Sequence, residues 1–335
     1  MKKVVIILII LVVLAAVAIP LYRYFMPYRV DNVTVEIPAE TTSSEIGSIL
    51  ADHHVIRGEL DFKVYLKLSG RGNDLQQGNY TFDGSYSLKE VVDRLEEGGE
   101  DSVGTRVTIP EGYNMEQIIA TLEEKGVTTR EEFLDAAANG DYNYDYIGEK
   151  GDALRVQGYL FPETYLFEKG ISAYDVINTM IAQFDSLLTD EWKAQLATRG
   201  LSIHDWVTMA SIVEKEAVVQ EDRPIIAGVF YNRLDQGMLL QSCATVQYAL
   251  GEVKPVLTNE DVAVDSPYNT YIHEGLPPTP IASPGEASLE AALYPADTTY
   301  LFFVAKPNGA HIFTNTYEEH LAAIEAIERG DYDNE

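Results

Sequence analysis

The sequence predicts an α+β protein in which an N-terminal transmembrane helix precedes a small strand–helix–helix–strand unit and a larger mixed α+β domain. Three observations support this prediction. A long apolar run opens the chain, a weak repeat of strand and helix patterns follows it, and further helix and strand patterns come without a glycine-rich nucleotide-binding signature. The expected domains are residues 1–28, 31–100 and 101–335, with 101–140 as a candidate second strand–helix unit.

The opening apolar run predicts a membrane anchor. Residues 4–19 are uninterrupted, and residues 21–26 extend the run past Pro20 to the length of about 20 residues that spans a bilayer. Two lysines before it favour a cytoplasmic N-terminus, which would make this a single-pass protein of the cell membrane with residues 30–335 outside. The alternative is a cleaved signal peptide, since residues 16–18 resemble a cleavage site. Apolar residues continue past that site and favour the anchor.

Charge and cysteine content exclude several classes of function. The chain has 53 acidic and 24 basic residues, a net charge of −29, and nucleic-acid binding is not expected because phosphates require clustered lysine and arginine. Cys243 is the only cysteine, so no intramolecular disulfide or cysteine-based metal cluster can form. The six histidines lack metal-ligand spacing, and we therefore expect no metal and no cofactor.

A weak internal repeat, offset by 72 residues, follows the anchor. Residues 35–38 are matched by 107–110, and each copy predicts a strand, a proline-containing turn and an amphipathic helix. Between the copies we expect a strand over 78–82 and a helix over 89–95, with a boundary at the turn residues 98–101. Small units of this kind beside a membrane anchor are often glycan-binding modules of the LysM type. The alternative is a spacer that sets the height of the next domain above the bilayer.

Short patterns predict the elements of the larger domain. A buried strand is expected over 300–305 because these residues form a continuous apolar run. Pro224 suits the first turn of a helix, where its missing N–H costs nothing. Four prolines make residues 276–285 a stiff extended loop, and residues 141–146 are also expected to loop. Helices are expected over 192–196, 204–217, 225–234, 287–293 and 317–328.

The most informative stretch is the largely apolar helix 208–217, which carries Glu214 and Glu216. Residues two positions apart do not share a helix face, so only one of these acids can point into a given cleft. A helical wheel places Glu216 beside large apolar residues, which favour a protonated carboxyl and suit a general acid. Glu214 falls among smaller residues. The alternative is an ordinary Glu216, solvated or salt-bridged with Arg223 at the helix end.

A series of motifs spread over nearly the whole chain carries a family resemblance. The central motif is Ala-Ser-Ile-Val-Glu-Lys-Glu at 210–216. The others occupy residues 158–165, 229–234, 266–271, 275–278, 281–285 and 300–304. In content and order they resemble the YceG-like endolytic murein transglycosylases. The second glutamate of the Glu-Lys-Glu run is the catalytic acid in that family, which corresponds to Glu216 here.

The resemblance implies a lytic transglycosylase, which needs one carboxylate where hydrolytic glycosidases normally need two. Glu216 would protonate the glycosidic oxygen between N-acetylmuramic acid (MurNAc) and N-acetylglucosamine (GlcNAc) within nascent strands. It would then accept the proton of the MurNAc C6 hydroxyl as that oxygen attacks the anomeric carbon. The products are 1,6-anhydro-MurNAc ends made without water. Positioning of the C6 hydroxyl replaces the second carboxylate, and such cuts would terminate strand elongation.

The motifs also supply candidate substrate-binding residues, which are Glu163, Asn232, Gln241, Tyr268 and Asn269. Amide and aromatic side chains suit sugars, although the asparagines can equally cap turns and the tyrosine can simply pack. The resemblance further implies that peptidoglycan glycan strands are the substrate and that peptidoglycan synthases of the elongation machinery are partners.

Two positions depart from the family pattern. Gln157 stands where Glu is expected, so a charge at that position is either lost or not essential. Cys243-Ala244 replaces an expected Asp-Pro after Ser242. We therefore assign no second catalytic carboxylate there and expect Cys243 to be buried and inert.

The sequence leaves three other functions open. A non-catalytic, membrane-anchored glycan-binding scaffold would tolerate Gln at position 216. A hydrolase with two acids, Glu216 with Glu163 or Asp265, would leave reducing ends. An assembly partner of the cell-wall synthesis machinery would cut only as a secondary activity.

Overall fold

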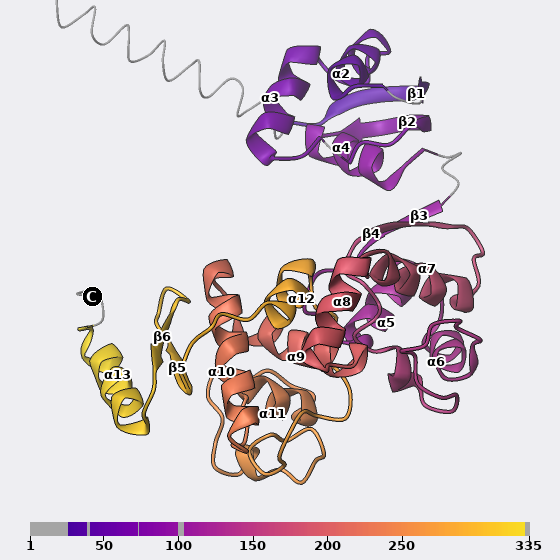
Figure 1. Cartoon of the computed structure of the whole chain (residues 1–335). Coiled ribbons are helices and arrows are strands. Elements are labelled where there is room, and N and C mark those ends of the chain that lie inside the picture. Colours follow the sequence, from indigo (N-terminus) through magenta and orange to yellow (C-terminus); the bar gives the residue numbers. More distant parts are fainter. Residues whose placement is uncertain (1–25, 39–40, 73, 100–103, 332–335) are drawn as a thin grey trace, which may run out of the picture. The chain divides into compact units, whose positions relative to one another are not determined.

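The computed structural model describes residues 26–38, 41–72, 74–99 and 104–331, which form a mixed α+β architecture as predicted (Figure 1). The chain divides into two compact units after Arg106, within β3 (Gly104–Thr108) and a few residues beyond the turn at 98–101. The predicted anchor, residues 1–28, lies outside the described residues except for its last three. Nothing within the described ranges is a helix of sufficient length and apolarity to cross a membrane.

The N-terminal unit is built on an antiparallel pair of strands, β1 (Tyr28–Ile37) and β2 (Gly78–Tyr86). Helices α2 (Ser43–Asp52) and α3 (Glu59–Ser69) connect the strands, and α4 (Leu88–Glu97) follows β2. Alternate strand residues turn to one face and pack with apolar helix residues in a core of their own. The strand predicted over 78–82 and the helix predicted over 89–95 are confirmed with longer bounds.

The internal repeat is seen in the structure. Helices α2 and α5 (Met115–Glu124) lie 72 residues apart, and each follows a strand and the proline just beyond it. Reciprocal capping boxes set their starts, with Thr42 and Glu45 at α2 and Asn114 and Gln117 at α5. Local sequence is therefore enough to begin both helices.

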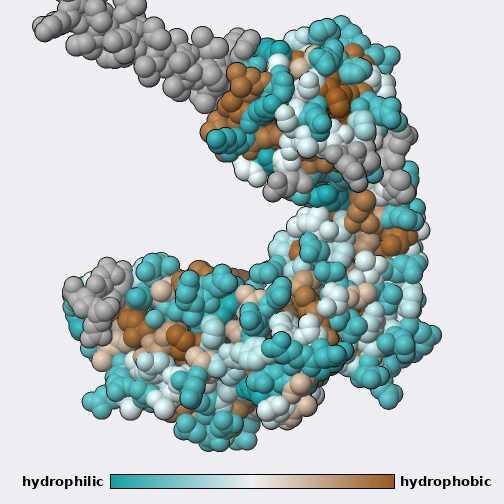
Figure 2. Space-filling model, turned by 45° about the horizontal axis from the view of Figure 1, so that its top comes forward, coloured by the Kyte–Doolittle hydropathy of each residue, from teal (hydrophilic) through white to brown (hydrophobic). Residues whose placement is uncertain are grey.

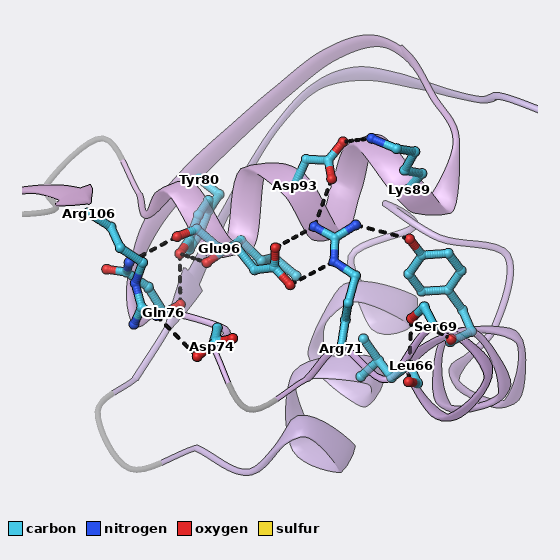
Figure 3. Close-up of polar contacts among 12 residues, drawn as sticks. Leu66, Ser69, Arg71, Asp74, Gln76, Tyr80, Lys89, Asp93, Glu96 and Arg106 are labelled. Carbon is cyan, nitrogen blue, oxygen red and sulfur yellow. Dashed lines mark hydrogen bonds and ion pairs between the residues drawn. The ribbon is translucent and has the colours of Figure 1, made fainter. Parts of the chain in front are cut away.

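Arg71 ties the segment after α3 to α4 (Figure 3). Its guanidinium donates to Asp93 at 2.7 Å, to both carboxylate oxygens of Glu96, and to the Tyr65 hydroxyl at 3.2 Å. Lys89 is a second cation on Asp93, at 2.7 Å. The side chains of Arg71, Asp93 and Glu96 are only 26%, 29% and 23% exposed, so water screens this cluster less than it screens a surface pair.

The C-terminal unit surrounds one helix, α9 (Ile203–Glu216). Every residue of α9 from Trp206 to Val213 is buried. Three helices pack against it: α10 (Arg223–Asp235), α11 (Cys243–Leu250) and α12 (Glu286–Leu293). Trp206 Nε1 also donates to the Leu289 carbonyl of α12 at 2.9 Å. The end of α9 is thus fixed where neighbouring segments meet.

The helices predicted in this unit are confirmed, with bounds that differ by a few residues. The remaining elements are α6 (Arg130–Asn139), β4 (Thr164–Glu168), α7 (Ala173–Ser186), α8 (Asp190–Arg199), β5 (Phe302–Ala305), β6 (His311–Thr314) and α13 (Tyr317–Arg329). The prediction of a buried strand over 300–305 is wrong in two respects. Only 302–305 form a strand, and it is largely half-exposed because it pairs with β6 alone in a two-stranded sheet.

We expect Arg71→Met to destabilise the N-terminal unit by about 1–3 kcal/mol, because two partly buried carboxylates lose their shared cation. Hydrogen exchange of peptides from α3 and α4 in the full chain measures this local loss. Arg29→Met is the control, since the Arg29–Asp31 pair is 77% exposed at both side chains and should contribute little. Equal effects of the two substitutions would contradict the assignment.

Candidate active site

Glu216 is the last residue of α9, and its half-buried carboxylate meets the start of α11. Its Oε1 atom accepts hydrogen bonds from the Ser242 hydroxyl at 2.5 Å and from the Ala244 N–H at 3.4 Å. Within the described chain, these hydrogen bonds reach Oε1 and none reaches Oε2. Backbone N–H groups at a helix start favour a negative charge. The carboxylate is therefore held through one of its two oxygens.

Buried hydroxyl groups position Ser242. Its N–H donates to Thr270 Oγ1 at 3.1 Å, and its carbonyl accepts from the Thr245 hydroxyl at 2.8 Å. The two threonine hydroxyls also lie 2.8 Å apart. Gln241, directly before Ser242, has a φ of 48°. A left-handed backbone at a non-glycine residue persists only where the surroundings fix it, and such strain gathers at functional sites.

Arg233 fixes the segment that leads to Ser242. It is buried in α10, and its guanidinium donates to the carbonyls of Leu240 at 2.8 Å and Leu301 at 2.6 Å. Burial lowers the pKa of Arg233, whereas the nearby Glu216 carboxylate acts in the opposite direction. A buried cation therefore both holds the backbone and lies within electrostatic reach of Glu216.

Cys243 is exposed, which corrects the expectation of a buried cysteine. The backbone is extended at Ser242, so Gln241 and Cys243 turn outward while Ser242 turns inward. The cysteine sulfur lies 3.2 Å from the Tyr271 hydroxyl. Burial raises the pKa of Tyr271, and Cys243 and the Glu216 carboxylate raise it further. The Tyr271 hydroxyl therefore keeps its proton at neutral pH.

The two residues before Glu216 hold other segments. Glu214 Oε2 accepts from the Ser288 hydroxyl at 2.6 Å and from the Gly285 N–H at 3.3 Å, at the start of α12. Lys215 Nζ donates to the Gly112 carbonyl at 3.2 Å, in the loop after β3. The two acids thus meet different helices, as expected for residues on different faces of α9.

A pocket of about 310 Å³ is lined by neighbours of the contact between Glu216 and α11, although Glu216 itself is not among its lining residues. It is lined by the start of α5, by Lys215 and by α11, including Ala244, whose N–H reaches Glu216. Its polar side chains include Asn114, Gln117, Gln247 and Tyr248. Amide and phenol groups of this kind can hydrogen-bond sugar hydroxyls and acetamido groups. Within the part of the chain that the structure describes, no cluster of three His, Cys, Asp or Glu residues could hold a metal.

Two of the five candidate substrate-binding residues lie near this site. Gln241 is exposed and precedes Ser242, so its side chain is available beside the Glu216 contact. Tyr268 packs on the pocket residue Tyr248 with ring centroids 4.7 Å apart, and its hydroxyl lies 2.8 Å from Thr279 Oγ1. Gln241 therefore lies next to Ser242, and Tyr268 lies next to a residue of the pocket.

The other three candidates have partners within the protein. Glu163 is exposed directly before β4, and its carboxylate accepts from the adjacent Thr164 N–H at 2.8 Å. Asn232 donates to two carbonyls before β5, at 2.8 and 3.0 Å. Asn269 is fully buried and donates to the carbonyls of Val262 and Val264. These bonds give both asparagines structural roles and argue against direct contact of Asn269 with a ligand.

Gln157 explains one departure from the family pattern. Its buried amide donates to the Pro280 carbonyl and to the Tyr248 hydroxyl, the latter at 2.7 Å. Neighbouring Gly158 has a φ of 87°, and a Cβ there would lie 2.5 Å from the Pro280 ring. The close approach of Pro280 requires glycine at 158. Because the Pro280 carbonyl can only accept a hydrogen bond, a donor and not a carboxylate is the useful group at 157.

Sequence reasoning did not single out Ser242, Thr270 or Arg233. Ser242 carries a local signal, because serine directly before a helix is a common N-cap. In the structure its hydroxyl binds Glu216 and does not cap α11. Thr270 and Arg233 contact segments that only the tertiary fold brings to them, and no local sequence pattern predicts such roles.

The fold and site define a class of α+β protein in which a carboxylate at the end of a buried helix meets the start of a second helix. Residues 35–326 match the model of the YceG-like family, and the chain belongs to this family. The crystal structure of a YceG-like protein from Listeria monocytogenes matches with a TM-score of 0.61 and 35% identity. That match covers 87% of this chain and 98% of the other.

Curated relatives agree with this family membership. An endolytic murein transglycosylase of Bacillus subtilis (strain 168) is 37% identical over 312 residues, which cover 88% of this chain and 84% of the relative. An endolytic murein transglycosylase of Streptococcus pneumoniae serotype 2 is 33% identical over 315 residues, 86% of this chain. The chain spans 57% of the length of that streptococcal relative.

Gln157→Glu should lower the free energy of unfolding by about 1–3 kcal/mol near neutral pH, because an ionised carboxylate would face the Pro280 carbonyl and lose its donor. The loss should shrink as the pH falls, since a protonated carboxyl can donate again. Thermal unfolding of wild type and variant, followed from neutral to acidic pH, measures the difference in stability at each pH. Gln220→Glu, at an exposed position, is the control and should change little. A pH-independent loss would argue for a packing defect instead.

Proposed function

We propose that this chain is a membrane-anchored endolytic peptidoglycan lytic transglycosylase with Glu216 as its acid and base. The observation that carries the proposal is the Glu216 carboxylate, held by Ser242 and the start of α11. The neighbouring residues Lys215 and Ala244 line a polar pocket. The Bacillus and streptococcal relatives are named endolytic murein transglycosylases, which supports the same activity here.

The geometry suits a single carboxylate in two roles. With Oε1 held by Ser242 and Ala244, Oε2 carries the proton and donates it to the glycosidic oxygen between MurNAc and GlcNAc. The bond to the MurNAc anomeric carbon breaks, and its electron pair stays on the protonated leaving oxygen. Glu216 then takes the proton of the MurNAc C6 hydroxyl as that oxygen bonds to the same carbon. The 1,6-anhydro end forms, Glu216 is protonated again, and no water is consumed.

The surroundings stabilise the charge that forms between these steps. When Glu216 gives up its proton, the Ser242 hydroxyl and the Ala244 N–H already point at the new carboxylate. Donors fixed before the reaction stabilise charge without reorganisation. The buried threonines Thr245 and Thr270 hydrogen-bond the Ser242 backbone and so fix the residue that carries this hydroxyl.

The proposal extends to location and partners. The apolar run at 4–26 anchors the chain in the cell membrane with the N-terminus cytoplasmic and the rest outside. The N-terminal unit is a LysM-like glycan-binding module, which its β1–α2–α3–β2 order supports. Cuts in nascent strands end their elongation, with peptidoglycan synthases as partners. A non-catalytic scaffold and a two-carboxylate hydrolase are the competing functions, and each gives a different result below.

Glu216→Gln should slow cleavage of uncrosslinked glycan strands by about 10²–10⁴-fold or more, because the amide keeps the shape but cannot transfer the proton. The melting temperature should be unchanged or higher. Mass spectrometry of the strand ends measures cleavage. Undiminished cleavage in this variant would remove Glu216 from the mechanism, and a wild type that cuts nothing would favour the scaffold.

Glu214→Gln is the matched control and should retain most activity. Its amide oxygen can still accept from the Ser288 hydroxyl. Burial and the charge of Glu214 both raise the pKa of Glu111, so the substitution also removes the repulsion between these two carboxylates. An inactive Glu214→Gln beside an active Glu216→Gln would reverse the assignment of the two acids.

Wild-type cleavage in water enriched in heavy oxygen should give 1,6-anhydro ends without label, because the attacking oxygen is the sugar's own C6 hydroxyl. Mass spectrometry of the ends detects an incorporated oxygen. Labelled, reducing ends would identify a hydrolase and require a second carboxylate.

A further inference from the structure

Helix α3 of the N-terminal unit is apolar on two opposite faces. One face packs into the core, where Phe62 and Leu66 are 0% and 7% exposed. The opposite face carries Leu60, Val64 and Leu68, which are 74%, 40% and 77% exposed. Their spacing of four residues aligns them in one stripe along the helix. Figure 2 shows such apolar surface, in brown, on the N-terminal unit.

This stripe starts beside the point where the apolar N-terminal run joins the unit. Met26 lines a small pocket with Arg57 and Asp61, which flank the start of α3. The Arg57 guanidinium donates to the Pro27 carbonyl at 3.4 Å and lies 5.7 Å from the centre of the Tyr28 ring. Only Pro27 separates Met26 from β1, and a chain extends at most about 3.5 Å per residue. The end of the apolar run, at Met26, is therefore close to the first turn of α3.

Exposed lysines accompany the stripe. Lys63 and Lys67 fall along one flank, next to Leu60 on the helix surface, and Lys63 also pairs with Glu59 at 2.5 Å. Lysine stems that run along apolar surface while the ammonium groups reach outward are typical of helices in a membrane interface. A helix that faced only water would carry polar residues on this side.

We propose that the exposed face of α3 lies on the lipid bilayer, with Leu60, Val64 and Leu68 in the headgroup region. This inference rests on the anchor in the proposed function, because an anchor at 4–26 brings the first turn of α3 to the membrane surface. The contact sets the orientation of the N-terminal unit on the bilayer. The competing occupants of the stripe are residues 1–25 themselves and a second copy of the chain.

A fluorescent label at position 64 tests the proposal in the full chain. The sole cysteine is first removed as Cys243→Ser, and Val64→Cys then carries an environment-sensitive dye. The protein is reconstituted in phosphatidylcholine–phosphatidylglycerol vesicles with or without brominated acyl chains, which quench only on contact. Val256→Cys is the matched control, because this valine of the C-terminal unit is 79% exposed. The label at 64 should shift to the blue and lose most of its emission, while the label at 256 should do neither.

Each other outcome overturns the inference in a recognisable way. A blue-shifted label at 64 that brominated lipid does not quench means that protein covers the stripe. A label that is neither shifted nor quenched means that the stripe faces water. If the chain fails to float with vesicles after an alkaline wash, the anchor fails and the lipid contact of α3 fails with it. A chain that floats with an unquenched position 64 keeps the anchor and rejects only the contact.

Discussion

The burial of α9 on every side is the constraint on which the candidate site depends. A helix enclosed by α10, α11 and α12 cannot rotate or slide without breaking its packing, so its last turn is fixed. That turn carries Glu214, Lys215 and Glu216, and each contacts a different segment: the start of α12, the loop after β3, and the start of α11. The run that carries the candidate acid therefore also joins the parts of the C-terminal unit around it.

The contacts of the candidate acid Glu216 are set by residues far from it in the sequence. Its carboxylate is half-buried at the end of α9 and accepts hydrogen bonds from Ser242 and Ala244 at Oε1. The donors are themselves fixed by Thr245, Thr270 and Arg233, so the geometry exists before any substrate binds.

The two departures from the family pattern acquire physical meaning in the structure. Gln157 supplies an amide donor to the Pro280 carbonyl, which an ionised glutamate could not do. Ala244 stands where the family pattern has proline, and its N–H donates to Glu216, whereas proline has no N–H to give. In this chain the start of α11 therefore contributes a backbone donor to the candidate acid.

The sequence by itself determined the features that depend on local pattern: the α+β class, most helices and the repeat at 72 residues. Its resemblance to a family added Glu216 as the candidate acid. Helix caps and hydrophobic spacing act over a few residues and can be read along the chain. Only the tertiary structure decided that Ser242, 26 residues away, binds Glu216, that Asn269 is buried while Cys243 is exposed, and that β5 lies in a two-stranded sheet. Burial and hydrogen bonds between distant segments arise from packing in three dimensions, which no periodicity in the sequence records.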